Sequence, residues 1–122
     1  MGQSGTQSWK ATVKLLQMDS CIICGMPVAA NGSWDHFIPL SQSLGPLKSM
    51  RLGLAYWAHQ LCNSFRGSAA PNKRMITRAL DVIRRMEPAD RDTAWYNLTM
   101  ALTEHRKYVQ TLETMLARRD VQ

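Results

Sequence analysis

Two short cysteine and histidine pairs constrain the fold of this chain more than any other feature of its sequence. Cys21 and Cys24 are separated by two residues, and His59 and Cys62 repeat that spacing later in the chain. Three cysteines are an odd number, which is not typical of a disulfide scaffold. The two pairs instead supply four ligands that can close a tetrahedron around Zn²⁺. We therefore predict a structural zinc site, and the alternative is that the cysteines pack as small apolar side chains.

The composition is that of a small basic protein. The chain has 122 residues, of which 45% are hydrophobic, so it has room for one compact core. Fifteen Lys and Arg against nine Asp and Glu leave a formal charge of +6, which favours a partner that carries phosphate groups. No apolar run approaches the ~18 residues of a membrane span, and no secretory signal is visible. We predict a soluble, cytoplasmic protein with no membrane partner.

Three parts with different patterns follow one another along the chain. Residues 1–8 are small and polar, which is typical of a flexible arm. Residues 9–70 contain all the candidate metal ligands and are predicted to form a zinc-stabilised α+β core. Residues 71–122 are rich in helical patterns and are predicted to form a helical extension that packs on this core or forms a dimer.

Within the predicted core, apolar periodicity favours a short helix over residues 9–18. The Asn-Gly pair at 31–32 predicts the turn of a β-hairpin, with a strand over residues 33–39. The next run without a helix breaker predicts a helix that includes or begins near His59 and stops at Gly67.

Two apolar stripes characterise the helical extension. The first precedes Pro88, which is expected to end its helix, and consists of Ile76, Ala79, Leu80, Ile83 and Met86. The second has the alternating steps of three and four of a heptad seam and consists of Trp95, Leu98, Leu102, His105, Val109, Leu112 and Leu116. This seam either packs against the preceding helix or forms a homodimer, and its length favours some role in self-association.

Polar residues beside the predicted zinc site are candidates for chemistry. Asp35 and His36 lie between the two ligand pairs, and Asn63 directly follows Cys62, so a closed zinc site would bring them together. Asp35 and Asn63 offer oxygen atoms suited to Mg²⁺ or Mn²⁺, and such a cation can act on phosphodiesters. His36 is the candidate general base, because an imidazole can take a proton from water near neutral pH.

These residues resemble those of the HNH, or ββα-metal, endonucleases, in the branch that carries zinc. The motifs that carry the resemblance are Cys21-x2-Cys24, Asp35-His36-Phe37-Ile38-Pro39-Leu40 and His59-x2-Cys62-Asn63-x2-Arg66-Gly67. The resemblance implies that Asp35 and Asn63 hold a catalytic cation, that His36 activates water and that Arg66 neutralises a phosphate oxygen. A weaker likeness extends to the recombination endonucleases that resolve branched DNA.

The sequence departs from this family at two places. The family's middle asparagine, which braces the loop before the helix, falls near Gly53 or Leu54, and neither side chain can make its hydrogen bond. His59 replaces a cysteine, which zinc accepts. Because His59 and Asn63 are four residues apart, a second arrangement stays open, in which both bind the catalytic cation with Asp35 and the cysteines form an incomplete site.

Basic residues near these motifs are candidates for contacts with DNA phosphates, and a solvated helix face is the alternative. They are Arg51, Arg66, Lys73, Arg74 and Arg78. The aromatic residues Trp34, Tyr56 and Trp57 are predicted to belong to the core rather than to stack on bases.

Three functions remain open from the sequence. The favoured one is metal-dependent hydrolysis of DNA phosphodiester bonds by an HNH endonuclease, with branched or nicked DNA as candidate substrates. The second is a catalytically inactive zinc module that binds DNA or protein. The third is an interaction protein that acts through the heptad seam, with the zinc site as a structural support.

Overall fold

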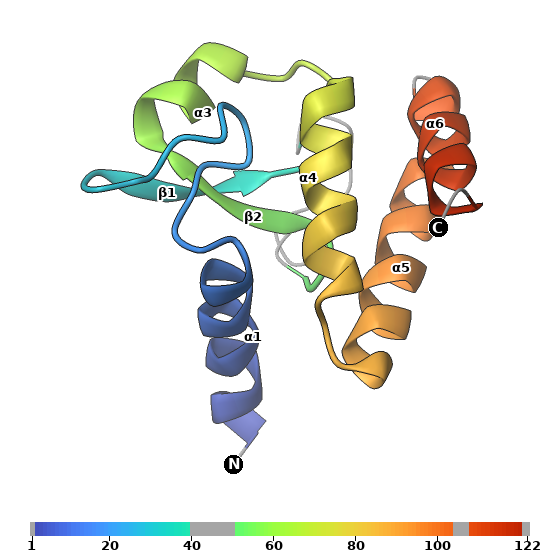
Figure 1. Cartoon of the computed structure of the whole chain (residues 1–122), viewed down its shortest axis with the longest axis horizontal. Helices are drawn as coiled ribbons and strands as arrows, with labels where there is room; N and C mark the ends of the chain where they lie inside the picture. The colour runs from blue at the N-terminus through green and yellow to red at the C-terminus, as the bar shows by residue number, and fades with distance from the viewer. Residues whose placement is uncertain (1, 40–50, 104–107, 121–122) are drawn as a thin grey trace.

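The structure, a computed structural model, describes residues 2–39, 51–103 and 108–120. Within these ranges the chain forms a two-stranded antiparallel sheet and five helices, so the predicted α+β class is confirmed. In chain order the elements are α1 (Gly2–Leu16), β1 (Gly32–His36), β2 (Ala55–His59), α3 (Gln60–Arg66), α4 (Lys73–Arg84), α5 (Pro88–Thr103) and α6 (Val109–Asp120). The sheet lies between α1 and α3, and α4, α5 and α6 stand together beside it (Figure 1).

The sheet joins two distant segments of the sequence. Trp34 of β1 lies opposite Trp57 of β2, and Asp35 lies opposite Tyr56. The predicted β-hairpin at residues 31–32 is therefore wrong, because β1 pairs with residues 55–59. Asn31 does adopt a turn conformation, with φ at 55°. The turn signal is local, whereas the choice of strand partner depends on the packing of the whole core.

The two faces of β1 carry different side chains. Because successive residues of a strand point to opposite faces, Ser33 and Asp35 share one face, and Trp34 and His36 share the other. Helix α3 covers the first face through hydrogen bonds to Ser33 and Asp35. Helix α1 covers the second, where the rings of Trp9 and Trp34 are 5.8 Å apart.

Helix α1 is longer than the sequence predicts. Its backbone is helical from Gly2, so the helix includes residues 2–8, and the flexibility of this arm stays a prediction. Helical hydrogen bonds are local, so a helix that begins in a packed segment can extend into neighbouring polar residues. At the other end, Met18 and Asp19 have φ values of 53° and 55°, which end the helix near the predicted position.

Helix α3 has the boundaries that the sequence predicts. His59 is its N-cap residue in an extended conformation, and Gly67 is its C-cap residue, with φ at 58°. The N–H of Gly67 donates to the carbonyl of Asn63. A positive φ favours glycine, which explains why the helix stops there.

The helical extension packs as three neighbouring helices. The first predicted apolar stripe is buried, and its members are Ile76, Ala79, Leu80, Ile83 and Met86. Helix α4 ends at Arg84, and Pro88 begins α5, where a proline loses no helical hydrogen bond. Asn72 caps α4 by accepting a hydrogen bond from the N–H of Met75 at 2.8 Å.

The heptad seam does not follow one helix, because it is divided between α5 and α6. Leu98 and Leu102 are buried within the chain, whereas Val109 and Leu116 are 47% and 41% exposed. His105 lies outside the described residues. Part of the seam therefore forms the internal contact between α5 and its neighbours, and the homodimer stays a prediction.

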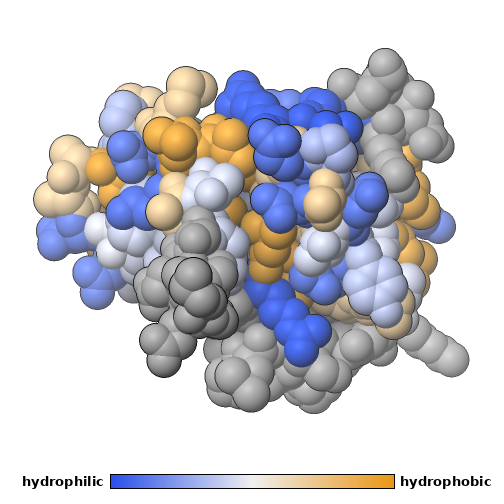
Figure 2. Space-filling model, turned by 90° about the horizontal axis from the view of Figure 1, so that it is seen from below, coloured by the Kyte–Doolittle hydropathy of each residue, from blue (hydrophilic) through white to orange (hydrophobic). Residues whose placement is uncertain are grey.

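The surface mixes polar and apolar residues (Figure 2). Several large apolar side chains are exposed, and they include Leu15, Leu61, Phe65 and Tyr96. Among the described helices, none combines the length and the apolar character that crossing a membrane requires.

Candidate metal centre and neighbouring polar cluster

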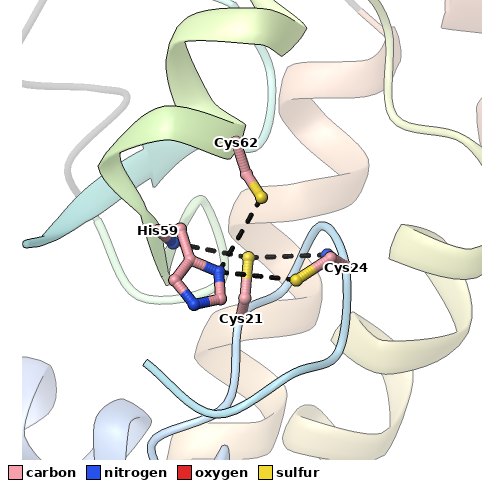
Figure 3. A group of neighbouring side chains, drawn as sticks. All are labelled: Cys21, Cys24, His59 and Cys62. Carbon is pink, nitrogen blue, oxygen red and sulfur yellow. Dashed lines mark hydrogen bonds between the residues drawn. The ribbon is translucent and has the colours of Figure 1, made fainter. Parts of the chain in front are cut away.

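The four predicted zinc ligands converge at one point. The ligand atoms of Cys21, Cys24, His59 and Cys62 all lie within 4.8 Å of one another. Cys21 and Cys24 come from the loop after α1, His59 from the end of β2 and Cys62 from α3 (Figure 3). The group could hold zinc, and its donor set of three thiols and one imidazole is typical of closed structural zinc sites.

The spacing of the donor atoms fits a tetrahedral ion. His59 Nδ1 lies 3.4 Å from Cys24 Sγ and 3.7 Å from Cys62 Sγ. In a tetrahedron with Zn–S near 2.3 Å and Zn–N near 2.0–2.1 Å, the N···S edge is about 3.6 Å. These two N···S separations are therefore close to those expected around the ion.

A hydrogen bond on the far side of the imidazole orients His59 toward the thiols. His59 Nε2 lies 2.9 Å from the carbonyl oxygen of Pro27. A carbonyl can only accept, so Nε2 carries the proton and Nδ1 presents its lone pair to Cys24 and Cys62. The structure thus places His59 with the cysteines. This is not the second arrangement open from the sequence, in which His59 joins Asp35 and Asn63.

Backbone N–H groups surround the sulfur of Cys21. Those of Ile23, Cys24 and His59 lie 3.3–3.4 Å from Cys21 Sγ. Burial raises the pKa of this thiol, but the backbone donors outweigh burial and lower the pKa to about 7. Burial and the neighbouring Cys21 raise the pKa of Cys62 to about 11. Zinc binding must therefore displace protons from part of the cluster.

Two residues that the sequence analysis missed hold the ligand residues in place, Gln17 through its side chain and Pro27 through its backbone carbonyl. Gln17, 4% exposed, donates to the carbonyls of Ser20 and Trp57 and accepts from the N–H of Trp57, at 2.8–2.9 Å. Pro27 supplies the carbonyl for His59. The position of Gln17 in an apolar helical pattern could have indicated a buried polar role for its side chain. The role of Pro27 leaves no signal in the sequence, because it acts through its backbone carbonyl.

Arg78 fastens the same loop to α4. Its Nη1 donates to the carbonyls of Ile22 and Ile23, at 3.0 and 2.7 Å. Gly25 follows with φ at +83°, and a Cβ at this position would lie 2.8 Å from Arg78 Nη2. The sequence predicts that Arg78 contacts DNA, but part of its guanidinium binds the zinc loop, the segment that carries Cys21 and Cys24.

Asp35 and Arg66 form a buried ion pair on the α3 side of β1. Arg66 Nη1 lies 2.8 and 2.6 Å from the two carboxylate oxygens of Asp35, and the side chains are 5% and 1% exposed. Arg66 also donates to the carbonyls of His36, Phe37 and Ala69. Burial raises the pKa of the Asp35 carboxyl, and the charge of Arg66 opposes that rise. In this arrangement the guanidinium of Arg66 is occupied by Asp35 and by backbone carbonyls, and its contact with a phosphate stays a prediction.

Asn63 lies beside this ion pair, and His36 does not share its face of the strand. Asn63 Nδ2 donates to Ser33 Oγ and to the carbonyl of Trp34, both at 3.2 Å. Asp35, Asn63 and Arg66 thus meet on one side of β1. His36 leaves the opposite side, and its Nδ1 is buried with no hydrogen-bond partner among the described residues.

The pairing of Asp35 does not fit a divalent cation as the residues stand. Both carboxylate oxygens accept from Arg66, and Mg²⁺ needs carboxylate oxygens directed toward it together with room for water. Within the described part of the chain, the cysteine and histidine group is the one cluster of His, Cys, Asp and Glu that could hold a metal.

The loop before β2 is braced without the family's middle asparagine. Asn97 of α5 donates to the carbonyl of Leu52 at 2.9 Å, and the Tyr56 hydroxyl donates to the carbonyl of Gly53 at 3.0 Å. Tyr56 is fully buried and Trp57 half-buried, in agreement with their prediction as core residues. One distant side chain, Asn97, and one nearby side chain, Tyr56, therefore supply the bracing that Gly53 and Leu54 lack.

The remaining candidates for phosphate contacts lie on the surface. Arg51, Lys73 and Arg74 are exposed. Comparisons of the chain with models of protein families, with curated proteins and with solved structures find no match.

Proposed function

We propose that the protein is an HNH-type DNA endonuclease in which zinc has a structural role. The observation that carries the proposal is the docking of α3 on β1. Asn63 and Arg66 bond to the strand segment that contains Asp35 and ends at His36. In the family that the motifs resemble, the same residue types on a strand and the following helix form the cleavage site. The cytoplasm, where thiols stay reduced, suits the cysteine site.

In this proposal the zinc group holds the cleavage residues in place. Cys62 and Asn63 are adjacent on α3, so ligands from the loop and from β2 fix the helix that carries Asn63. Structural zinc sites of this kind contribute directly to folding free energy. Loss of zinc would therefore release α3 from β1.

His36 is the proposed general base. Its Nδ1 is buried without a partner among the described residues, which is unfavourable, and a catalytic role is one explanation for such a group. His36 would accept a proton from the water that attacks the phosphodiester. Since His36 and Asp35 point to opposite faces of β1, the DNA would have to approach the end of the strand, where both are near.

Asp35 and Asn63 would hold the Mg²⁺ or Mn²⁺ that the resemblance implies. Because Arg66 occupies both oxygens of Asp35, cation binding there requires this ion pair to open. The carbonyls of His36 and Phe37 could retain the released guanidinium.

The same ion pair favours the second candidate function, a catalytically inactive zinc module that binds DNA or protein. A carboxylate that is 1% exposed and neutralised by Arg66 acts as a structural group. In this case the α3–β1 unit would serve only as a scaffold.

A plasmid-nicking assay separates the two functions. Zinc-loaded protein in buffer free of other metals is incubated with supercoiled plasmid, with and without added Mg²⁺ or Mn²⁺. We expect nicking only with the added cation, and no nicking by His36→Ala. Gln60→Ala, an exposed change on α3, is the matched control and should keep activity.

Zinc content and circular dichroism show that each variant is folded. If the wild-type protein binds DNA but leaves supercoiled, nicked and branched substrates intact with either cation, the inactive module is the correct function. Cleavage by His36→Ala at the wild-type rate would remove His36 from the mechanism.

A further inference from the structure

A basic groove lies between α4 and α6. Of its lining residues, Arg78 also contacts the loop that carries Cys21 and Cys24. The groove has a volume of about 360 Å³, and it is lined by Lys73, Arg74, Thr77, Arg78 and Arg118. Helices α4 and α6 pack against each other (Figure 1). The groove between them is lined by residues from distant parts of the sequence, such as Lys73 and Arg118.

The positive charges of the groove are not neutralised locally. Among the described residues, no Asp or Glu lines it, and Lys73 and Arg74 are exposed without an ionic partner. Like charges at close range repel one another. A bound anion would remove this repulsion, and the groove is therefore complementary to a negatively charged ligand.

Two arginines outside the groove, by contrast, form ion pairs with aspartates. On α4, Arg84 lies 2.6 Å from the carboxylate of Asp81, and in the core Arg66 pairs with Asp35. Within the groove, Arg118 instead donates from Nη1 to the hydroxyl of Thr77. This bond orients a guanidinium across the groove and leaves its charge uncompensated.

Arg78 connects the groove to the zinc loop. It lines the groove and also donates to the carbonyls of Ile22 and Ile23, between the two cysteines of the loop. An anion in the groove would therefore lie beside the zinc loop.

We propose that this groove binds the phosphate backbone of nucleic acid, with Lys73, Arg74 and Arg118 as the main phosphate contacts. The choice of nucleic acid among polyanions rests on the proposed function, whereas the preference for an anion follows from the charge of the groove. The groove holds one strand of the nucleic acid outside the cleavage site, and its contacts with phosphates do not depend on the base sequence. Arg118, absent from the candidates found in the sequence, belongs to this surface.

The test measures binding separately from cleavage. Anisotropy of a fluorescent duplex is recorded over a salt series, in buffer without Mg²⁺ or Mn²⁺, for the wild-type protein and for Arg74→Gln/Arg118→Gln. In a plot of log affinity against log salt concentration, each phosphate contact increases the magnitude of the slope by about one. We expect the double variant to bind more weakly and its slope to fall by about 2. Arg84→Gln, on α4 but outside the groove, should change the slope by much less.

Each result decides the proposal. If the double variant and the wild-type protein have equal slopes, or if Arg84→Gln lowers the slope as much, the groove is not the binding surface. Binding to phosphatidylserine vesicles but not to DNA would also overturn the proposal. Retained zinc and an unchanged melting temperature show that the double variant is folded.

The outcomes also separate this proposal from the endonuclease. DNA binding through the groove without plasmid nicking would retain the groove and overturn the endonuclease. Nicking by the wild-type protein, together with equal slopes for the wild-type protein and the double variant, would retain the endonuclease and overturn the groove.

Discussion

The guanidinium of Arg66 holds the carboxylate of Asp35 through a single nitrogen, Nη1, which lies 2.6 and 2.8 Å from the two oxygens. The pair joins the end of α3 to β1 in an environment that is almost fully buried. A residue whose motif predicts a phosphate contact thus takes part in the packing of helix on strand.

Removal of Arg66 should destabilise the protein strongly. Arg66→Ala leaves Asp35 buried without its partner and frees three carbonyls, so we expect a loss of about 3–5 kcal/mol in the free energy of unfolding. Urea denaturation followed by circular dichroism measures this loss. The double change Asp35→Ala/Arg66→Ala should cost less than the sum of the two single changes, because the double variant retains no unpaired buried charge. A stability for Arg66→Ala within ~0.5 kcal/mol of wild type would contradict a buried ion pair.

Zinc should bind in a one-to-one ratio and depend on His59. In His59→Gln one of the four donors is lost, so metal analysis should find zinc greatly reduced and the melting temperature lowered. The matched control is His36→Gln, which removes an imidazole at the other end of the sheet, outside the cluster. It should keep full zinc. Equal zinc content in the two variants would show that His59 is not a ligand.

Gln17 should stabilise the loop that carries the first two cysteines. Gln17→Ala removes three hydrogen bonds, among them the one that the N–H of Trp57 donates, while the carbonyl of Trp57 keeps the N–H of Ile22 as a donor. We expect a loss of about 1–3 kcal/mol in urea denaturation. Leu15→Ala, on the same helix but 76% exposed, should change stability by less than about 0.5 kcal/mol. Similar losses in the two variants would argue against the Gln17 bridge.

The two parts of the heptad seam should respond differently to substitution. Leu98→Ala creates a cavity in the core and should cost about 2–5 kcal/mol. Leu116→Ala, at a position 41% exposed, should cost much less. Thermal unfolding measures both changes.

If a homodimer forms, it must use the exposed part of the seam. Val109→Glu/Leu116→Glu should therefore shift the sedimentation coefficient from dimer to monomer without unfolding the chain. A dimer that survives both substitutions would place the interface elsewhere.

The sequence by itself determined the four candidate zinc ligands, the stop of α3 at Gly67 and the buried stripe of α4. Each depends on a short-range rule: ligand spacing, the positive φ that glycine allows, and helical periodicity. The proximity of the four ligand residues is confirmed, and so is the α+β class. The predicted endonuclease and its cation remain proposals.

Only the tertiary structure decided which distant groups meet. It paired β1 with β2, turned Arg66 and Arg78 toward backbone carbonyls and brought Arg118 to the groove beside α4. An arginine has the same propensities whether it meets a phosphate, a carboxylate or a carbonyl, so its sequence position cannot select among them. The selection follows from packing, because a guanidinium that the fold buries must find acceptors within the protein.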